Sequence, residues 1–302
     1  MRDDARRILV VEGNDPETLA RAASVGIGGA AERYGAVLSQ IDPRVSFSIA
    51  RPSEPDFDAA AVELDGVSGV ALTGSGVAWS ADAREAAPHH VMLERAFAAG
   101  IPVFGSCWGL QVGAVALGGA VGWGAAGLEL GVARAITLTE AGRAHPMFAG
   151  KPSTFDSVCI HRDEVTRAPQ GARVLAGNAH SAVQAIAYEA GGVRFWGVQY
   201  HPELTLGDIG DYLATPGRSS AFDDSKFRSV EDAAQVIADL RAIGADPASH
   251  APLRWRYGVS ADVSEPSRLR RELANWLCSL APAEAASVAT DQAGSLQVTT
   301  RS

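Results

Sequence analysis

The sequence predicts an α/β fold with a mixed, mostly parallel sheet flanked by helices. In the first two hundred residues, short β-branched runs alternate with longer, alanine-rich amphipathic segments, a pattern typical of βαβ units around a parallel sheet. After Gly119 the strand-like runs follow one another closely, and Gly191 and Gly192 mark a hairpin turn between two of them. We therefore expect an antiparallel part of the sheet beside the parallel part.

The predicted elements of the first half are bounded by glycines. Residues 7–13, 69–74 and 101–106 form apolar runs that predict buried strands, and residues 89–100 predict a helix. The glycine cluster at residues 26–29 lacks the spacing of a nucleotide-binding loop and does not directly follow a strand. It is predicted to be a flexible loop or the start of a helix.

The C-terminal third has a different residue pattern from the first two hundred residues. A polar segment over residues 210–227 predicts a surface loop or lid. Two amphipathic helices are predicted after it, one from Ser229 to Gly244 and one from near Ser264, with a proline in its first turn, to Pro282. Their apolar stripes consist of Ala233, Val236, Ile237 and Leu240 in the first helix, and of Leu269, Leu273, Trp276, Leu277 and Leu280 in the second. These stripes should be buried against the rest of the protein or bind a partner.

Composition excludes several classes of protein. The chain has 302 residues, of which 47% are hydrophobic, so it is long enough to fold around a full core. A formal net charge of −9 argues against a nucleic-acid partner, because such proteins need clustered Lys and Arg. The first apolar run, Ile8 to Val11, is too short for a signal peptide or a membrane span. We therefore expect a cytoplasmic protein with no nucleic-acid or membrane partner.

The spacing of cysteines and histidines also favours an intracellular protein without a metal site. The three cysteines lie far apart and form no CxxC pair, which predicts free thiols in a reducing compartment and excludes a disulfide framework or a structural zinc site. No cluster of His, Cys and carboxylates has metal-ligand spacing. We predict neither a metal nor another cofactor.

One cysteine stands at a junction between a predicted strand and a predicted helix. Cys107 lies in the run Gly-Ser-Cys-Trp-Gly, between Gly105 and Gly109. This is the pattern of a nucleophile elbow, in which glycines let the backbone pack closely and the nucleophile is held out at the edge of the sheet. The positive end of the helix dipole would favour the thiolate of Cys107. The alternative is a small buried cysteine in a tight turn.

A thiol nucleophile needs a histidine to carry protons and a third group to orient it. Of seven histidines, His201 alone ends a predicted buried strand with a carboxylate, Glu203, two residues on. In an extended segment, residues i and i+2 point the same way, so Glu203 can reach the imidazole while Pro202 stiffens the spacing. As a lone motif His-Pro-Glu is more often a surface turn, but together with the elbow it predicts a catalytic pair.

With these two motifs, the sequence resembles a known family, the class I (triad) glutamine amidotransferases. The family's G-x-C-x-G-x-Q elbow and G-x-Q-[FY]-H-P-E strand end are both present in full. Further matches follow in the family's order at residues 67–76, 118–119, 127–131, 145–150 and 161–165. The resemblance covers roughly residues 7–205. It implies a flavodoxin-like amidotransferase domain over residues 1–210, followed by a C-terminal loop and helical extension with a frayed tail over residues 211–302.

The resemblance also implies roles for individual residues. Cys107 would be the nucleophile, His201 the general base and acid, Glu203 the orienting carboxylate, and Gln111 a group that helps to hold the substrate glutamine. The backbone N–H groups of Trp108 and Ser75 would form the oxyanion hole. Many relatives have Gly-Gly-Pro where this chain has Gly74-Ser75-Gly76, a form associated with the stand-alone, GMP-synthase-like branch, so Gly74 is an alternative donor.

The implied reaction is hydrolysis of a glutamine side-chain amide to glutamate and ammonia through a γ-glutamyl thioester. The sequence contains neither an SGG-x-DS pyrophosphatase loop nor a GxxxxGK[ST] loop, so any ammonia-accepting synthetase would be a separate chain. The main alternative is a γ-glutamyl hydrolase or peptidase that uses the same triad on γ-glutamyl amines or peptides. A catalytically idle regulatory module is a further alternative, which the intact triad disfavours.

Other polar residues are assigned structural roles. His161 and Asp163 are expected on a loop near the site. His89 and His90 are expected at the exposed start of a helix. Cys159 and Cys278 lack flanking glycines and are predicted to be inert packing residues.

Overall fold

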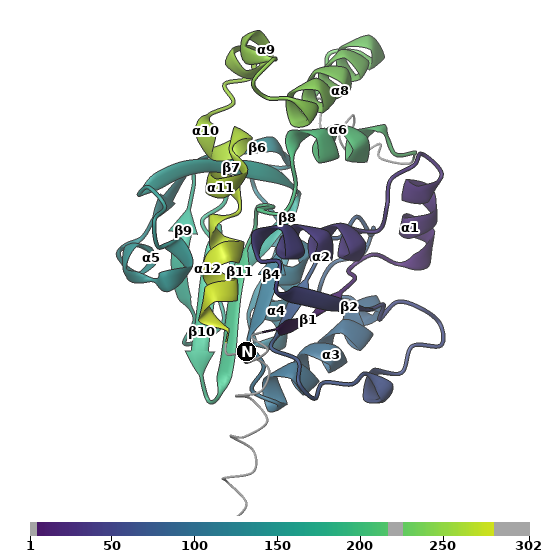
Figure 1. Ribbon diagram of the computed structural model, residues 1–302, viewed down its shortest axis with the longest axis vertical. Coiled ribbons are helices and arrows are strands. Elements are labelled where there is room, and N and C mark those ends of the chain that lie inside the picture. The colour runs from purple at the N-terminus through teal and green to yellow at the C-terminus, as the bar shows by residue number, and fades with distance from the viewer. Residues whose placement is uncertain (1–4, 217–225, 281–302) are drawn as a thin grey trace, which may run out of the picture.

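The computed structural model describes residues 5–216 and 226–280 and has an α/β architecture (Figure 1). Its strands are β1 (Arg6–Val11), β2 (Val45–Ala50), β3 (Gly69–Leu72), β4 (Val103–Ser106), β5 (Ala120–Trp123), β6 (Glu129–Leu138), β7 (Thr154–His161), β8 (Asp163–Arg167), β9 (Arg173–Gly177), β10 (Ala185–Ala190) and β11 (Val193–Val198). Its helices are α1 (Pro16–Ala23), α2 (Ala30–Ile41), α3 (Ala87–Ala98), α4 (Trp108–Ala116), α5 (Glu140–Ala144), α6 (Leu206–Ala214), α8 (Val230–Ala245), α9 (Ala251–Arg256), α10 (Ala261–Ser264), α11 (Pro266–Leu269) and α12 (Arg271–Ser279). Within these described ranges, no helix is both long enough and apolar enough to span a membrane.

The central sheet has nine strands in the order β2-β1-β3-β4-β11-β10-β9-β6-β7. Strands β2, β1, β3, β4 and β11 pair in parallel, and the strands from β11 to β7 pair in antiparallel fashion. The hairpin between β10 and β11 turns at Gly191 and Gly192, whose φ angles of 60° and 83° are readily adopted only by glycine. The mixed, mostly parallel sheet and its hairpin are therefore confirmed.

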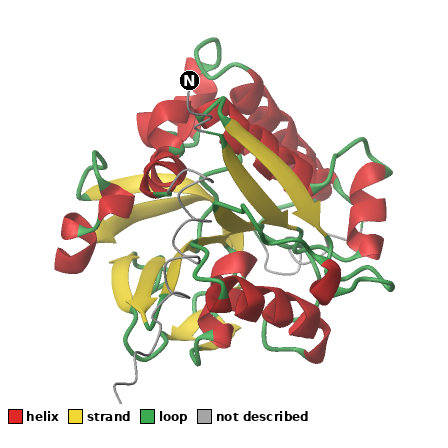
Figure 2. Ribbon diagram, turned by 60° about the horizontal axis from the view of Figure 1, so that its bottom comes forward, coloured by secondary structure: helices red, strands yellow, loops and turns green. Residues whose placement is uncertain are grey.

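Helices cover both faces of the sheet (Figure 2). Successive side chains of a strand point to opposite faces, so Ile8 and Val10 of β1 pack in a core with α2 and α12, while Leu9 and Val11 pack in a second core with α3 and α4. The predicted strands over residues 7–13, 69–74 and 101–106 correspond to β1, β3 and β4. The predicted helix over residues 89–100 corresponds to α3.

The segment predicted to be a polar loop at residues 210–227 is partly helical. Thr205 and Asp208 form a capping box that starts α6, and the helix continues to Ala214 because Ile209 and Leu213 are buried along it. The prediction was therefore wrong for residues 210–214, and residues 217–225 lie outside the described residues.

The first predicted C-terminal helix is confirmed as α8. Ser229 caps it by accepting a hydrogen bond from the backbone of Asp232, and the helix ends at Ala245. Leu240 and Ile243 are buried in a third core together with residues of α6. The two helices approach closely at Gly207 and Gly244, where a Cβ on Gly244 would lie 2.3 Å from the Gly207 nitrogen.

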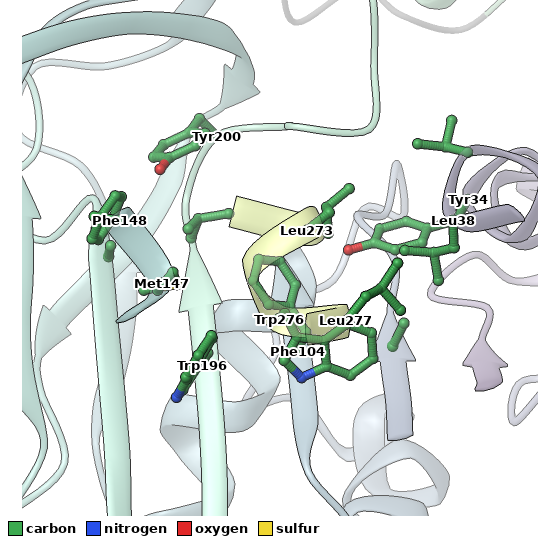
Figure 3. Packing of buried hydrophobic residues seen from close by; sticks show 14 of the residues in the cluster. Tyr34, Leu38, Phe104, Met147, Phe148, Trp196, Tyr200, Leu273, Trp276 and Leu277 are labelled. Carbon is green, nitrogen blue, oxygen red and sulfur yellow. The ribbon is translucent and has the colours of Figure 1, made fainter. Parts of the chain in front are cut away.

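The second predicted helix is divided in the structure. Its apolar stripe faces two cores: Leu269 of α11 packs in the third core, whereas Leu273, Trp276 and Leu277 of α12 pack in the core that contains Ile8. A single straight helix cannot face both cores. The helix is therefore interrupted at Arg270, which lies between α11 and α12. Figure 3 shows Trp276 beside Phe104 of β4, with ring centroids 5.7 Å apart. Helix α12 is thus packed directly on the central sheet.

Candidate active site

Cys107 occupies a strained corner between β4 and α4. Its φ of 52° is positive, which is costly for a residue with a side chain. The flanking glycines are required sterically: a Cβ on Gly105 would lie 2.5 Å from the Gly109 backbone, and one on Gly109 would lie 2.6 Å from the Leu72 carbonyl oxygen. The backbone N–H of Cys107 donates to the Val198 carbonyl at 2.7 Å, which ties the corner to β11. The expected elbow is therefore present.

The thiol of Cys107 is buried among backbone and amide groups. Its Sγ lies 3.6 Å from the Ile160 carbonyl oxygen, to which the thiol can donate, and the side-chain amide of Gln199 donates to Sγ at 3.6 Å. Gln199 immediately precedes the Tyr-His-Pro-Glu segment. The sulfur is therefore positioned by one acceptor and one donor.

The imidazole of His201 is held by Glu203. Its Nδ1 lies 2.6 Å from Oε1 of Glu203, and both side chains are buried. Burial lowers the pKa of His201, but the negative charges of Glu203 and of the Cys107 thiolate outweigh it and hold the pKa at about 10. Nε2, the ring nitrogen that does not face Glu203, is buried, and the imidazole interacts with the Cys107 side chain.

The loop at Gly74-Ser75-Gly76 borders this ring. A Cβ on Gly74 would lie 2.5 Å from Cε1 of His201, so glycine is needed there. The Ser75 hydroxyl donates to the Gly13 carbonyl at 2.8 Å, and the amide of Gly76 donates to the Asn14 side chain at 2.8 Å. The loop is thus fixed from the end of β1.

Glu12 fixes that strand end in turn. One carboxylate oxygen accepts from the backbone and side chain of Asn14, and the other accepts from the backbone of Ala31 at the start of α2. Glu12 and Asn14 are not among the site residues that the sequence predicts. The available signal was their position after the carboxyl end of a parallel strand, where sites form in open α/β sheets.

Gln111 lies one helical turn beyond Cys107 and points toward β8. Its Nε2 donates to the Asp163 carbonyl at 2.7 Å and lies 3.2 Å from the Gln199 side-chain oxygen. His161 ends β7, and Asp163 begins β8. The expectation that both lie on a loop was wrong, because His161 pairs with Glu129 of β6 and Asp163 pairs with Trp123 of β5. Burial, the largest influence, raises the pKa of the Asp163 carboxyl.

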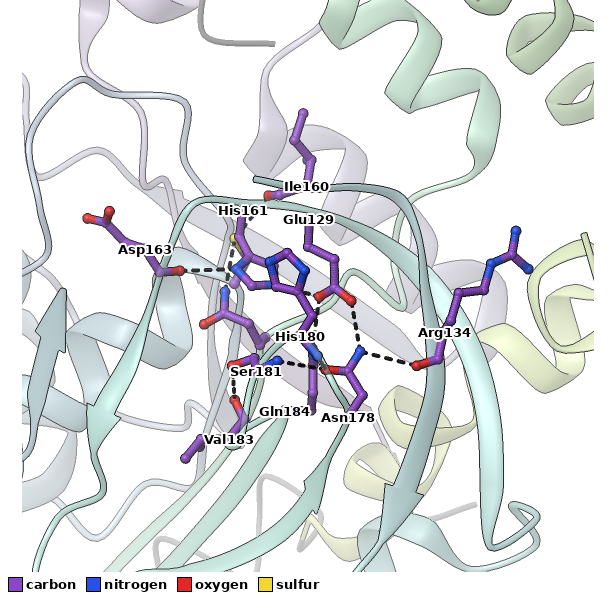
Figure 4. Close-up of polar contacts among 12 residues, drawn as sticks. Glu129, Arg134, Ile160, His161, Asp163, Asn178, His180, Ser181, Val183 and Gln184 are labelled. Carbon is purple, nitrogen blue, oxygen red and sulfur yellow. Dashed lines mark hydrogen bonds and ion pairs between the residues drawn. The ribbon is translucent and has the colours of Figure 1, made fainter. Parts of the chain in front are cut away.

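A buried polar network stands behind this segment (Figure 4). Glu129 accepts from Nε2 of His161 at 2.8 Å, from Gln184 at 2.9 Å and from Asn178 at 2.7 Å. Burial raises the pKa of Glu129, but these donors and the charge of His161 outweigh it, so the pKa lies below its usual value. The network fixes the His161–Asp163 backbone, which supports the structural role expected for His161.

Trp108 follows the nucleophile, and its indole is buried. The ring packs edge-on against Trp79 and His89, with centroids 5.4 Å and 4.8 Å away. His89 is itself fully buried in α3, and its Nε2 lies 3.0 Å from the Glu12 carbonyl oxygen. The prediction that His89 lies at an exposed helix start was wrong, because α3 turns this face toward the site. Burial lowers the pKa of His89 to about 4.

The other two cysteines differ from each other. Cys159 is fully buried in β7, and burial, reinforced by the charge of Glu129, raises the pKa of its thiol well above the usual value. Cys278 is exposed on α12, so the prediction that it packs inside the protein was wrong. Its position on the helix faces away from Leu273 and Trp276, which carry the buried stripe.

A cavity opens beside His201 and encloses about 770 Å³ not occupied by protein atoms, counting the part open to solvent. Its lining comes from α1, α2, α6 and the loops that end β1, β3 and β11. Gly74, Ser75, His201 and Glu203 all contribute to its wall, whereas Gln111 does not. Of the three triad candidates, His201 and Glu203 therefore border this cavity and Cys107 does not.

Comparisons with known proteins identify the family. Residues 44–215 match the model of the class-I glutamine amidotransferases. A γ-glutamyl-L-1-hydroxyisopropylamide hydrolase from a Pseudomonas species is 34% identical over 280 residues, covering 90% of this chain and 92% of that protein. A glutamine-hydrolysing GMP synthase of Symbiobacterium thermophilum is 41% identical over 105 residues, and the match covers 35% of this chain but 19% of the synthase.

Solved structures agree on the fold. A glutamine amidotransferase from Methylobacillus flagellatus superposes with a TM-score of 0.60 at 18% identity, covering 92% of this chain and 96% of that one. One from Thermotoga maritima has a TM-score of 0.57 at 18% identity, covering 89% and 98%. Since the family model spans more than half of the chain and the Pseudomonas relative aligns over nearly its whole length, this protein belongs to the class I glutamine amidotransferase family.

Proposed function

We propose that the protein hydrolyses the amide bond of a γ-glutamyl substrate, glutamine being the simplest, with Cys107, His201 and Glu203 as its triad. One observation carries this proposal: the Cys107 thiol interacts with the buried imidazole of His201, whose Nδ1 lies 2.6 Å from the Glu203 carboxylate. Such an arrangement suits nucleophilic catalysis, in which the base takes and returns the proton and the third group orients it.

In the first half-reaction the Cys107 thiolate attacks the γ-carbonyl carbon. A sulfur–carbon bond forms, and the carbonyl electron pair moves onto oxygen. The backbone N–H of Trp108 and that of Ser75, or alternatively Gly74, stabilise this oxyanion. When the intermediate collapses, the carbon–nitrogen bond breaks and Nε2 of His201 gives its proton to the departing nitrogen.

In the second half-reaction water attacks the γ-glutamyl thioester. His201 accepts a proton from the water as the new oxygen–carbon bond forms, and the sulfur–carbon bond then breaks to regenerate the thiolate. Glutamate leaves from the side of the site that contains Gln111, which helps to hold the glutamyl group. No other reactant is consumed.

A second candidate is hydrolysis of an N-substituted γ-glutamyl amide, which releases an amine in place of ammonia. The Pseudomonas relative, whose name describes such a reaction, aligns over 92% of its length, whereas the GMP synthase aligns over 19% of its own. If ammonia is the useful product instead, a synthetase on a separate chain would consume it. The three free thiols suit a cytoplasmic location for either reaction.

A substrate panel tests the proposal. Wild-type protein should release glutamate from glutamine or from a γ-glutamyl amide, with one equivalent of ammonia or amine for each glutamate. Both products should be quantified, and Cys107→Ala should release neither. Glutamate release that persists in Cys107→Ala, or no release from any γ-glutamyl compound by a folded wild-type protein, would refute the proposed function.

A further inference from the structure

The loop that follows β3 carries the second proposed oxyanion donor, and the side chain of Thr73 fixes its direction. The Thr73 hydroxyl accepts a hydrogen bond from the backbone N–H of Gly13 at 2.9 Å and donates one to the Gly74 carbonyl oxygen at 2.8 Å. Thr73 is buried. The hydroxyl therefore joins the end of β1 to the first peptide unit of the loop inside the protein.

The Gly74 carbonyl and the Ser75 N–H belong to one peptide unit. That peptide is trans, so its N–H points opposite to its carbonyl. In the sheet, β3 lies between β1 and β4, and the Gly74 carbonyl faces the β1 side, where a Cβ on Gly13 would lie 3.0 Å from its oxygen. The Ser75 N–H is therefore directed toward the β4 side, where Cys107 follows the strand end.

Asn14 holds the next peptide unit of the loop from the same strand end. Its side-chain oxygen accepts from the Gly76 N–H at 2.8 Å, and its side-chain NH2 group donates to Glu12 at 2.8 Å. Glu12 fixes which end of the amide faces the loop, because an ionised carboxylate only accepts hydrogen bonds. The loop is thus held on both sides of Ser75.

Gly13 sets the spacing between the two residues that supply the proposed oxyanion donors. A Cβ on Gly13 would lie 3.1 Å from Cβ of Ser75 and 3.1 Å from Cε3 of Trp108. The end of β1 is therefore packed between the loop and the residue that follows the nucleophile. A shift of this strand end would move the two donors relative to each other.

We propose that Thr73 is a positioning residue of the oxyanion hole and that it makes Ser75, rather than Gly74, the second donor. The proposal rests on the proposed function, because an oxyanion forms only if the thiolate attacks a γ-glutamyl carbonyl. Thr73 acts through the Gly74–Ser75 peptide, and Asn14 supports the same loop through Gly76. An oxyanion develops only as the reaction proceeds, so loss of the Thr73 hydroxyl should lower kcat and leave substrate binding largely unchanged.

The experiment removes the Thr73 hydroxyl from the full-length protein with little change of shape. Thr73→Val should lower kcat by at least about tenfold and change KM by less than about threefold, since removal of an oxyanion donor outright costs about 10²–10³ in kcat. Thr73→Ser keeps the hydroxyl and should retain most of the wild-type kcat. The substrate is the γ-glutamyl compound that the wild-type protein hydrolyses fastest in the substrate panel.

Thr139→Val is the matched control. The Thr139 hydroxyl likewise accepts from one backbone N–H, that of Gly142 at 3.0 Å, and donates to a backbone carbonyl, that of Val174 at 2.9 Å, at the start of α5. Thr139→Val should lower the melting temperature, as Thr73→Val should, but leave kcat unchanged. Asn14→Ala provides a second test of the loop, because it removes the acceptor for Gly76 and should also lower kcat with little change in KM.

Alkylation of Cys107 distinguishes a misplaced donor from damage to the elbow. Iodoacetamide reacts with a thiolate by displacement of iodide from a CH2 carbon, so no charge develops on a carbonyl oxygen. The rate of alkylation at Cys107, followed by peptide mapping, should therefore be the same in Thr73→Val as in the wild-type protein.

The outcomes separate this proposal from the proposed function. A wild-type kcat in folded Thr73→Val overturns the role of Thr73, and so do equal falls of kcat in Thr73→Val and Thr139→Val. A kcat in Thr73→Ser as low as in Thr73→Val, or a parallel fall of hydrolysis and alkylation, overturns it as well. If Thr73→Val does not fold, a wild-type kcat in Asn14→Ala overturns it. No glutamate release from any γ-glutamyl compound by the wild-type protein overturns the proposed function instead.

Discussion

Tyr200 donates a 2.6 Å hydrogen bond to Glu272, and this buried contact joins the residue before His201 to the C-terminal helix α12. Lys151 pairs with the same carboxylate at 2.9 Å, and its ammonium group also lies 4.3 Å from the centre of the Phe155 ring. Burial and the charge of Glu272 raise the pKa of Tyr200 well above its usual value, so its hydroxyl remains a donor.

Removal of Lys151 should destabilise the protein strongly. Both members of the Lys151–Glu272 pair are buried, and loss of one partner leaves an uncompensated charge, which costs about 3–5 kcal/mol. We expect Lys151→Met to lower the free energy of unfolding by that amount in denaturant titration. The control is Arg228→Met, which breaks an exposed pair with Asp232 and should leave stability nearly unchanged. Similar, small effects of both substitutions would contradict this account of the pair.

Cys107 should be the only cysteine whose loss abolishes hydrolysis. Cys107→Ser should release no detectable glutamate, because the hydroxyl is a much weaker nucleophile at neutral pH. Cys159→Ala and Cys278→Ala should retain near wild-type rates, since Cys159 has a raised pKa and Cys278 lies exposed on α12. Peptide mapping after labelling with a glutamine-mimicking electrophile checks this directly. An adduct on Cys159 or Cys278 would remove Cys107 from the mechanism.

His201 should contribute more to the rate than Glu203. Replacement of His201 by Ala removes the proton carrier from both half-reactions, whereas Glu203→Gln leaves an imidazole that is less well oriented. We expect kcat to fall further in His201→Ala than in Glu203→Gln. Steady-state rates with a single γ-glutamyl substrate suffice, and a wild-type kcat in His201→Ala would exclude the assigned role.

The pH dependence should reveal the charge of Glu203. The folded-state pKa of His201 is raised to about 10, so its imidazolium contributes stability that is fully present below about pH 6.5 and is lost as the pH rises through 10. Because Glu203 raises this pKa, Glu203→Gln should move the alkaline limb of kcat/KM to lower pH. Glu129→Gln alters the other buried His–Glu pair and should leave the position of that limb unchanged. An unshifted limb in Glu203→Gln would show that another group titrates there.

His89 should make the protein sensitive to acid. Its pKa is lowered to about 4, so the folded state binds fewer protons than the unfolded state and stability is lost as the pH falls from 6.5 toward 4. Between pH 7 and 4.5 this residue alone should cost about 2–3 kcal/mol. His89→Gln can still donate to the Glu12 carbonyl and should lose less stability than wild type over that range. Equal losses in the two proteins would contradict the assignment, and the titration of His89 followed by NMR gives an independent check.

Local spacing in the sequence predicted the features that depend on a few consecutive residues. The elbow follows from Gly105, Cys107 and Gly109, because only glycine tolerates the close backbone contacts of that corner. The pairing of His201 with Glu203 was also expected, but the reason given for it was wrong: the segment is not extended but turns at Pro202 and Glu203, with the Leu204 backbone N–H donating to the His201 carbonyl at 3.4 Å. The hairpin at Gly191 and Gly192 follows from the positive φ angles that such a turn requires.

The tertiary structure alone decided the features that depend on residues far apart in the chain. Burial of His89 depends on Glu12, 77 positions earlier, and the break at Arg270 arises because Leu269 and Leu273 face different cores. The partners of Glu129 and Glu272 likewise come from distant strands and helices. The cavity beside His201 exists only where α1, α2 and α6 meet. A periodic pattern records which face of an element is apolar, but the neighbour that covers that face is set by packing across the whole chain.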